Sequence, residues 1–185
     1  PSGSNPLSRL PNARPAPRKA IAQADLITLG VGFNSLPWIT GACHKVFDAA
    51  CRAATITPFV ADMDAILSEI DSLRGGRPTA VRVTTPFNDV VADGWDNTAF
   101  YGPTVLAQGP TTVRAFLDDM VARTCAVVRS HRAKCVNLYR AFNGPNGKKP
   151  LGPGFFTPKF GDLNQPGQER VAAEIMKLGF APLTR

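Results

Sequence analysis

The sequence predicts an α/β layer fold built on a parallel sheet. Three short, nearly continuous apolar segments alternate with three amphipathic stretches of helical period along its 185 residues. Continuous apolar runs are typical of strands buried on both faces, and strand–helix alternation is typical of a parallel sheet. The chain also has 16 glycines and 17 prolines, which indicates long loops between the elements.

The first strand is expected over residues 25–31, where an apolar run ends at Gly30. The residues before it, 1–19, are rich in Pro, Ser, Asn and Arg and have no apolar period. They predict an extended arm, followed by a single domain over residues 20–185.

The first helix is expected over residues 58–73. Thr57 has the residue type of a helix N-cap, Pro58 suits a first helical position, and Gly75 suits a helix end. The second strand follows over residues 79–85, which are again mostly apolar and β-branched.

The remaining elements repeat this alternation. Residues 88–109 are rich in turn formers and predict a long functional loop. A helix is expected from Pro110 onward, a third strand over residues 135–139 and a last helix over residues 168–178, after a Gly- and Pro-rich loop over residues 143–161. Ligands of such sheets bind beyond the carboxyl ends of the strands.

The chain is basic, with a formal net charge of +7 and an isoelectric point near 9.6. Such a surface favours anionic partners. The only cluster of basic residues lies in the arm, and no aromatic residues alternate with it as in single-stranded nucleic-acid binders. We therefore do not expect a nucleic-acid partner. No apolar run approaches the ~20 residues of a membrane span, so no transmembrane segment is expected.

The four cysteines form two close pairs, Cys43 with Cys51 and Cys125 with Cys135. Neither pair has Cys-x-x-Cys zinc spacing, and we expect neither a metal nor a cofactor. Two local disulfides would indicate an oxidising compartment, hence a secreted or cell-envelope protein. The alternative is four buried free thiols.

The segment Gly32-Phe33-Asn34 follows the first strand directly. Glycine permits a tight turn there, and the Asn34 amide would then project over the edge of the sheet. An amide in that position can donate a hydrogen bond to a developing oxyanion. The alternative is an asparagine that merely closes a strand–helix turn.

This segment resembles the third sequence block of the SGNH (GDSL) hydrolase family, an apolar strand followed by Gly-x-Asn-Asp, with Ser35 in place of the final Asp. Residues 162–172 resemble the family's last block, and the Cys43–Cys51 loop resembles that of secreted actinobacterial members. The resemblance implies a three-layer αβα fold with a flavodoxin-like sheet. It also implies an esterase, lipase or acyl-transfer activity, with Asn34 as oxyanion donor beside Gly32.

Two features depart from the family pattern. Asp162 stands where the resemblance implies the catalytic His, and Lys159 stands where it implies the orienting Asp. The Gly-Asp-Ser block that carries the nucleophile is absent, so either the first strands of the fold are lacking or a second chain, a swapped segment or a cleaved piece supplies them. His44 is a candidate replacement base, with a surface role as the alternative.

Two functions from different classes follow. The first is a secreted ester hydrolase that acts on an ester or on an acylated small molecule, glycan or lipid. The second is a non-catalytic domain of the same fold that binds a carbohydrate, lipid or protein partner at the former active face. A basic binding module that uses the arm over residues 1–19 is a third option.

Overall fold

The computed structural model of the chain describes residues 15–32, 48–88, 98–149, 151, 153–156 and 162–183, with the backbone alone at 15–16, 98–112 and 153. Three parallel strands alternate with helices, which confirms the predicted fold class. In chain order the elements are α2 (Pro15–Gln23), β1 (Leu26–Gly30), α4 (Ala49–Arg74), β2 (Ala80–Thr84), α5 (Thr98–Ser130), β3 (Lys134–Val136), α6 (Leu138–Asn143), the 3-10 helix η2 (Pro153–Phe155) and α7 (Gln165–Lys177).

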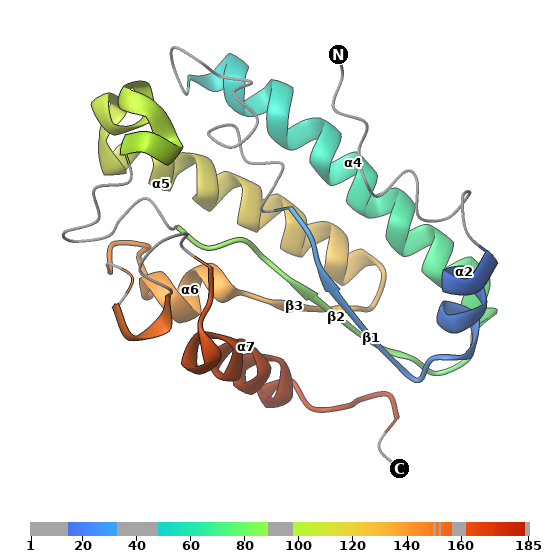
Figure 1. Ribbon diagram of the computed structural model, residues 1–185. Helices are drawn as coiled ribbons and strands as arrows, with labels where there is room; N and C mark the ends of the chain where they lie inside the picture. Colours follow the sequence, from blue (N-terminus) through green and yellow to red (C-terminus); the bar gives the residue numbers. More distant parts are fainter. Residues whose placement is uncertain are drawn as a thin grey trace.

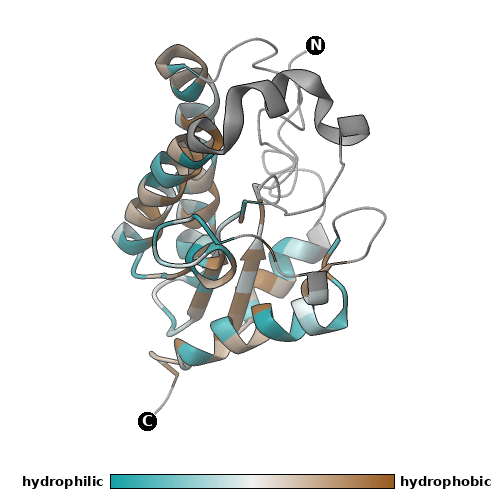
Figure 2. Cartoon of the chain, turned by 90° about the vertical axis from the view of Figure 1, so that its left-hand side faces the viewer, coloured by the Kyte–Doolittle hydropathy of each residue, from teal (hydrophilic) through white to brown (hydrophobic). Residues whose placement is uncertain are grey.

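The sheet has the strand order β1-β2-β3, with β2 in the centre. Helices α4 and α5 lie on one face of the sheet, and α6 and α7 lie on the other (Figure 1). Figure 2 shows the strands as a hydrophobic layer between helices of more polar character. These are the three layers that a parallel sheet requires to bury both of its faces.

Each face of the sheet has its own apolar core. The larger core joins the sheet to α4 and α5, and its fully buried members include Ile56, Met63, Val83, Phe116 and Met120. The smaller core lies under α6 and α7 and contains the buried residues Phe87, Val136, Leu138, Phe142, Leu151 and Phe156. The alternation of side chains along β2 sends Val83 into the larger core and the residues beside it to the other face.

Strand β1 is open on one side and on one face. Among the described residues it pairs only with β2. Ile27 is buried in the larger core, whereas Leu26 is 41% exposed and Thr28 and Gly30 are also exposed. Strands of parallel sheets are normally covered on both faces, so within the described residues β1 is unusual in having an unpaired edge and an uncovered face.

Helix α4 begins nine residues before the predicted start at Pro58, at Ala49. Its N-cap is Asp48, whose side chain accepts a hydrogen bond from the Cys51 N–H at 2.8 Å. The prediction took Thr57-Pro58 as a helix start, but Pro58 lies inside α4. The free energy gained from the apolar packing of the helix exceeds the cost of the hydrogen bond that Pro58, which has no N–H, cannot form.

The predicted loop over residues 88–109 is wrong from residue 98 onward, where α5 begins. Glycine and proline in this stretch favour turns, but α5 continues through them. Similarly, residues 15–19 of the predicted extended arm form the first turns of α2, and the rest of the arm lies outside the described residues. Neither α5 nor another helix in the described part of the chain is long and apolar enough to cross a membrane.

The third strand ends at Val136, three residues before the predicted end. Asn137 stops it, because its side chain accepts a hydrogen bond from the Arg140 N–H at 2.9 Å and so caps helix α6. The last helix likewise begins at Gln165 rather than at 168, capped by Asn164, whose side chain accepts from the Gly167 N–H at 3.0 Å.

One of the two predicted disulfides is confirmed. Cys125 of α5 and Cys135 of β3 are bonded, with their Cα atoms 5.3 Å apart. Cys51 is also disulfide-bonded, while its predicted partner Cys43 lies outside the described residues. The alternative of four free thiols is therefore excluded for Cys51, Cys125 and Cys135.

Arg82 occupies the middle of β2 and is only 1% exposed. Its Nη1 donates to the Val81 carbonyl at 3.0 Å, and its Nη2 donates to the carbonyls of Gly179 and Ala181 in the C-terminal segment. Burial lowers the pKa of Arg82. The C-terminal segment thus covers a cation that lies in the sheet itself.

His131, in the turn between α5 and β3, bridges two carboxylates of α4. Its Nδ1 lies 2.7 Å from Asp71 Oδ2 and its Nε2 lies 2.9 Å from Asp64 Oδ1. Partial burial lowers the pKa of His131, but the hydrogen bonds and charges of Asp64 and Asp71 raise it more, so the pKa lies above its ordinary value. The histidine, at the amino ends of the strands, therefore ties the turn before β3 to helix α4.

Replacing His131 by asparagine is expected to lower the free energy of unfolding by about 0.5–1 kcal/mol in mild acid, as for partly exposed ion pairs. Because the pKa of His131 is raised in the folded state, its stabilisation is complete below the unfolded pKa of about 6.5 and is lost as pH rises through the folded value. Urea unfolding at pH 5.5 and pH 9 measures the difference. An equal loss at both pH values would show that the imidazolium charge contributes nothing.

Candidate functional site

A cleft of about 510 Å³ lies at the carboxyl ends of β1 and β2. This is the end at which ligands bind in parallel sheets. Its lining joins apolar side chains and small residues to a few polar groups: Gly30, Val31, Thr84, Thr85, Pro86, Phe87, Leu138, Asp162, Leu163, Gln168 and Val171. Such a mixture suits a ligand that has both an apolar and a polar part.

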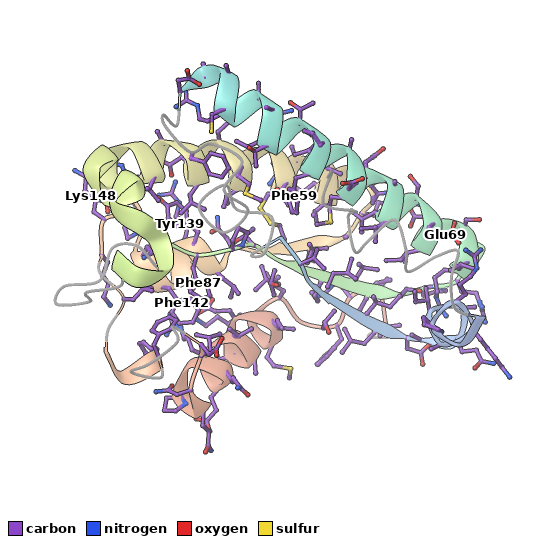
Figure 3. The ribbon with its side chains drawn as sticks, turned by 45° about the horizontal axis from the view of Figure 1, so that its top comes forward. Phe59, Glu69, Phe87, Tyr139, Phe142 and Lys148 are labelled. Atoms are coloured by element: carbon purple, nitrogen blue, oxygen red, sulfur yellow. A yellow bond between two sulfur atoms is a disulfide. The ribbon has the colours of Figure 1, made fainter. Side chains whose placement is uncertain are left out.

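The apolar wall of the cleft is backed by a cluster of phenylalanines. Phe87 packs against Phe142 with ring centroids 5.1 Å apart and against Phe156 at 5.5 Å, and Phe142 meets Phe155 at 5.8 Å. Figure 3 shows Phe87 and Phe142 side by side. Tilted ring pairs of this kind hold the wall in one arrangement.

A buried pair of asparagines fixes the chain beyond β2. Asn143 Oδ1 accepts from the Asn88 N–H at 2.8 Å, and Asn143 Nδ2 donates to the Asn88 carbonyl at 2.9 Å and to the Lys149 carbonyl at 3.1 Å. Both asparagines are fully buried. The amide of Asn143 thus replaces a strand partner for Asn88 and keeps the adjacent Phe87 in the wall of the cleft.

Two threonine hydroxyls at the floor of the cleft are bonded to the backbone. Thr84 Oγ1 donates to the Leu29 carbonyl at 3.2 Å, and Thr85 Oγ1 accepts from the Tyr139 N–H at 3.4 Å. Thr85 is 2% exposed. These contacts tie the ends of β1 and β2 to α6, so the threonines contribute to the shape of the cleft.

Tyr139 lies beneath this floor and is fully buried. Burial raises the pKa of Tyr139 to about 12, with a further contribution from the charge of Asp118. Its phenol is therefore neutral at physiological pH. A neutral, buried phenol supplies packing and no nucleophile.

Asp162 lies at the rim of the cleft, at the amino end of α7. It is exposed, and the next residue, Leu163, forms a β-bridge with Phe156. Asn164 anchors the same stretch by donating to the Gly154 carbonyl at 3.0 Å. The carboxylate of Asp162 can accept hydrogen bonds from the polar part of a ligand.

Gly32 follows the end of β1 with a φ of +108°. A Cβ atom at this position would lie 2.6 and 2.8 Å from two ring carbons of Phe59, which is buried on α4. Only glycine fits both the backbone angle and the space. Position 32, where the sequence predicts a tight turn, therefore requires glycine.

The structure brings Asp162 and the end of β1 to one cleft. Asn34, His44, Cys43 and Lys159 lie outside the described residues, so their predicted roles stay predictions. The lining residues Phe87 and Leu138 and the amide of Asn143 are not among the predicted site residues. The signal for Phe87 was its place just after a strand, whereas nothing in the sequence distinguishes Asn143 from a loop asparagine.

Fold and cleft together define an α/β domain with a parallel sheet and a ligand cleft at the strand ends. No protein-family model matches the chain, and no curated protein matches it.

Proposed function

We propose that the chain is an SGNH-type domain that acts in the hydrolysis or transfer of an acyl ester outside the cytoplasm. The observation that carries this proposal is the cleft at the carboxyl ends of β1 and β2, lined by both Asp162 and the residues that lead into Gly32. The disulfide between Cys125 and Cys135 supports an oxidising compartment.

The apolar lining is the proposed site of the acyl group. Val31, Phe87, Leu138, Leu163 and Val171 supply hydrocarbon surface within about 510 Å³. That volume is in the range of small-molecule sites and suits a short acyl chain. Asp162 and Gln168 line the same cleft and would meet the more polar alcohol part of the ester.

The turn at Gly32 is the proposed origin of the oxyanion site. Gly32 follows β1 at the end of the sheet where the cleft lies, and its φ is +108°. Asn34, two residues further, would donate its amide hydrogen to the oxyanion that forms when the ester carbonyl is attacked.

The free edge of β1 is the proposed place of the strand that carries the nucleophile. In the flavodoxin-like order 2-1-3-4-5, three consecutive parallel strands in the order β1-β2-β3 correspond to strands 3, 4 and 5. The strand numbered 1 then pairs with the edge of β1 that is unoccupied among the described residues. A serine at its carboxyl end would reach the cleft and Asp162.

Labelling with a fluorophosphonate tests the proposal. The protein is purified as its host makes it, with any bound chains retained, and near-ultraviolet circular dichroism confirms that it is folded. We expect covalent labelling of one serine together with hydrolysis of short p-nitrophenyl esters, and mass spectrometry then identifies the chain that carries the serine. A folded sample with neither labelling nor hydrolysis overturns the proposed activity.

Replacing Asp162 by histidine is expected to raise the rate of labelling at least about tenfold, because imidazole is a much better base for a serine hydroxyl at neutral pH than a carboxylate. The matched control is Gln168→His, which adds an imidazole to the same cleft at another position. Equal rates for both variants would show that position 162 has no special relation to the nucleophile.

A non-catalytic domain that binds an acylated ligand is the second candidate. It is favoured by one observation: no serine or histidine lines the cleft in the part of the chain that the structure describes. Binding of a short acyl ester in a titration, with no turnover and no labelling, would support this candidate over the hydrolase.

A further inference from the structure

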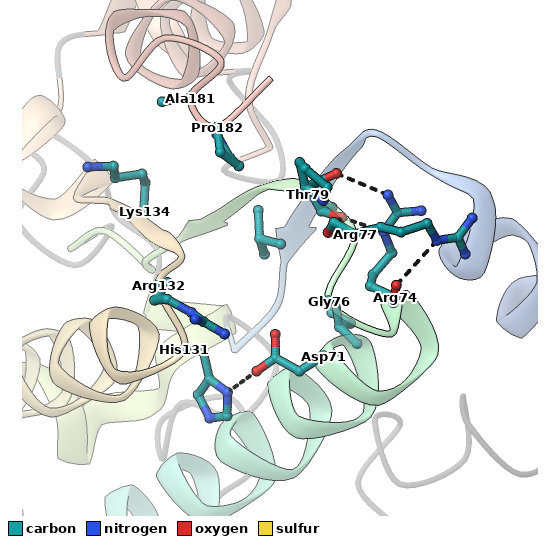
Figure 4. A pocket seen from close by; sticks show the side chains of 13 residues that line it. Asp71, Arg74, Gly76, Arg77, Thr79, His131, Arg132, Lys134, Ala181 and Pro182 are labelled. Atoms are coloured by element: carbon teal, nitrogen blue, oxygen red, sulfur yellow. Dashed lines mark hydrogen bonds and ion pairs between the residues drawn. The ribbon is translucent and has the colours of Figure 1, made fainter. Parts of the chain in front are cut away.

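A second cleft, of about 540 Å³, lies at the opposite end of the sheet, where α4 ends and β2 and β3 begin. Its ionisable lining residues are four permanent cations, one histidine and a single carboxylate: Arg74, Arg77, Arg132, Lys134, His131 and Asp71 (Figure 4). Asp71 is bonded to His131, which also contacts Asp64, so these carboxylates face the imidazole and are not paired with the four cations. The four cations outnumber the single carboxylate of the lining, so the cleft has an excess of positive charge.

Two of these cations have structural roles. Arg74 is 5% exposed, and its guanidinium donates to Thr79 Oγ1, to the Ala22 carbonyl at 2.8 Å and to the Pro78 carbonyl at 3.1 Å. Arg77 donates to the carbonyls of Ala22 and Arg74. The carbonyls satisfy the donors of both guanidiniums, and Asp25, 3.8 Å from Arg74, offsets part of the charge of Arg74.

The other two cations are exposed, and neither Arg132 nor Lys134 has a side-chain ion pair or hydrogen bond within the described residues. Lys134 stands opposite Arg82 in the register of the sheet. The buried guanidinium of Arg82 has no carboxylate partner in the described residues, and its Nε has no hydrogen-bond partner there. A buried charge behind the cleft wall raises the positive potential further.

Arg132 also occupies a backbone position that favours glycine. It has a φ of +58°, its N–H bonds to the Arg129 carbonyl, and the next N–H, of Ala133, bonds to the Val128 carbonyl. This pair of bonds is the Schellman end of helix α5, where glycine is the usual residue. Helix α4 has Gly75 at its own left-handed end. Arg132 thus occupies a strained backbone position, and its side chain adds positive charge to the cleft.

We infer that this cleft binds a linear polyanion that lacks nucleobases, such as a chain of phosphate or carboxylate groups. Figure 4 shows Lys134, Arg132 and Arg77 at separate positions around the cleft, so their charges do not converge on one point. Charges spread in this way match repeated anions on a polymer better than a single phosphate. The lining contains no Phe, Tyr or Trp side chain on which a base could stack, and the one aromatic ring, that of His131, is bonded to Asp64 and Asp71.

Binding of sodium polyphosphate and of polyglutamate to the purified protein tests the inference, measured by fluorescence anisotropy at several salt concentrations. The key variant is Arg132→Gly, because glycine suits the backbone there and Tm should stay equal or rise. We expect Arg132→Gly to weaken binding about threefold to tenfold and to reduce the salt slope by about one. The double variant with Lys134→Gln should weaken it further.

The matched control is Lys148→Gln, which removes an exposed cation in the loop after α6, outside the lining of the cleft. It should leave binding almost unchanged, so a loss equal to that of Arg132→Gly would show general attraction to a basic surface and overturn the site. Absence of binding to both polymers also overturns it, as does clearly tighter binding of a single-stranded oligonucleotide. Ester hydrolysis does not enter this assay, so its outcome is independent of the proposed activity.

Discussion

Replacing Gly32 by alanine should lower the free energy of unfolding by about 3 kcal/mol. An L-residue at a positive φ costs about 1–2 kcal/mol, and an added methyl group in a filled space costs about 1–3 kcal/mol. Both penalties apply here, because the φ is +108° and the new Cβ would lie 2.6 Å from the Phe59 ring. Urea denaturation measures the loss.

Gly30, two residues earlier, is the matched control. A Cβ there would meet only Thr84 Oγ1, at 3.6 Å, which is an ordinary contact. Gly30→Ala should therefore change stability by less than about 1 kcal/mol. A second variant, Gly32→Ala with Phe59→Leu, separates the two penalties by removing the ring. If the two single glycine variants prove equally stable, the turn at Gly32 is not constrained as described.

Asn143→Ala is expected to lower the free energy of unfolding by about 3–4 kcal/mol, since each buried polar group that loses its partner costs about 1–3 kcal/mol. The variant removes three hydrogen bonds, to the N–H and carbonyl of Asn88 and to the Lys149 carbonyl. The residue is 0% exposed, so water does not replace these bonds without entering the core. Thermal and urea unfolding both report the change.

Asn146→Ala serves as its control, because that exposed side chain accepts one hydrogen bond, from the Lys148 N–H at 3.3 Å. Its loss should cost less than about 1 kcal/mol. A second measurement reports on the shape of the cleft. Asn143→Ala should weaken binding of a short acyl ester, because the hydrogen bonds that hold Asn88 next to Phe87 are lost. Wild-type stability in Asn143→Ala would contradict the role given to the asparagine pair.

The central elements of the fold were predictable because their signals are local and strong. The apolar runs of β1 and β2 are continuous, and the helical period of α4 covers residues Phe59 to Leu73. The ends of elements were less predictable, since they depend on single side chains. Asp48 and Asn137 cap helices by hydrogen bonds that the sequence does not distinguish from turn contacts, and Pro58 remains inside α4 because the helix packs on both sides of it.

Less of the candidate site was predictable. The general place of ligands at strand ends directs attention to the end of the sheet where Asp162 lies, while the role of Asp162 stays a prediction. The wall of the cleft depends on residues far apart in the chain, such as Phe87 and Phe142, whose contact is a property of the assembled layers. The basic cleft was equally hard to predict. Arg77 and Lys134 are far apart in the sequence, and they line one cleft only because the turns at the amino ends of the strands lie together.

The burial of Arg82 also has a consequence for the order of events during synthesis. Its partners Gly179 and Ala181 follow it by 97 and 99 residues. At about 5–20 residues per second, the ribosome adds them on the order of 5–20 s after the arginine. Until then the guanidinium has only the Val81 carbonyl among its partners and must remain hydrated, so the middle of the sheet closes only after the C-terminal segment has emerged.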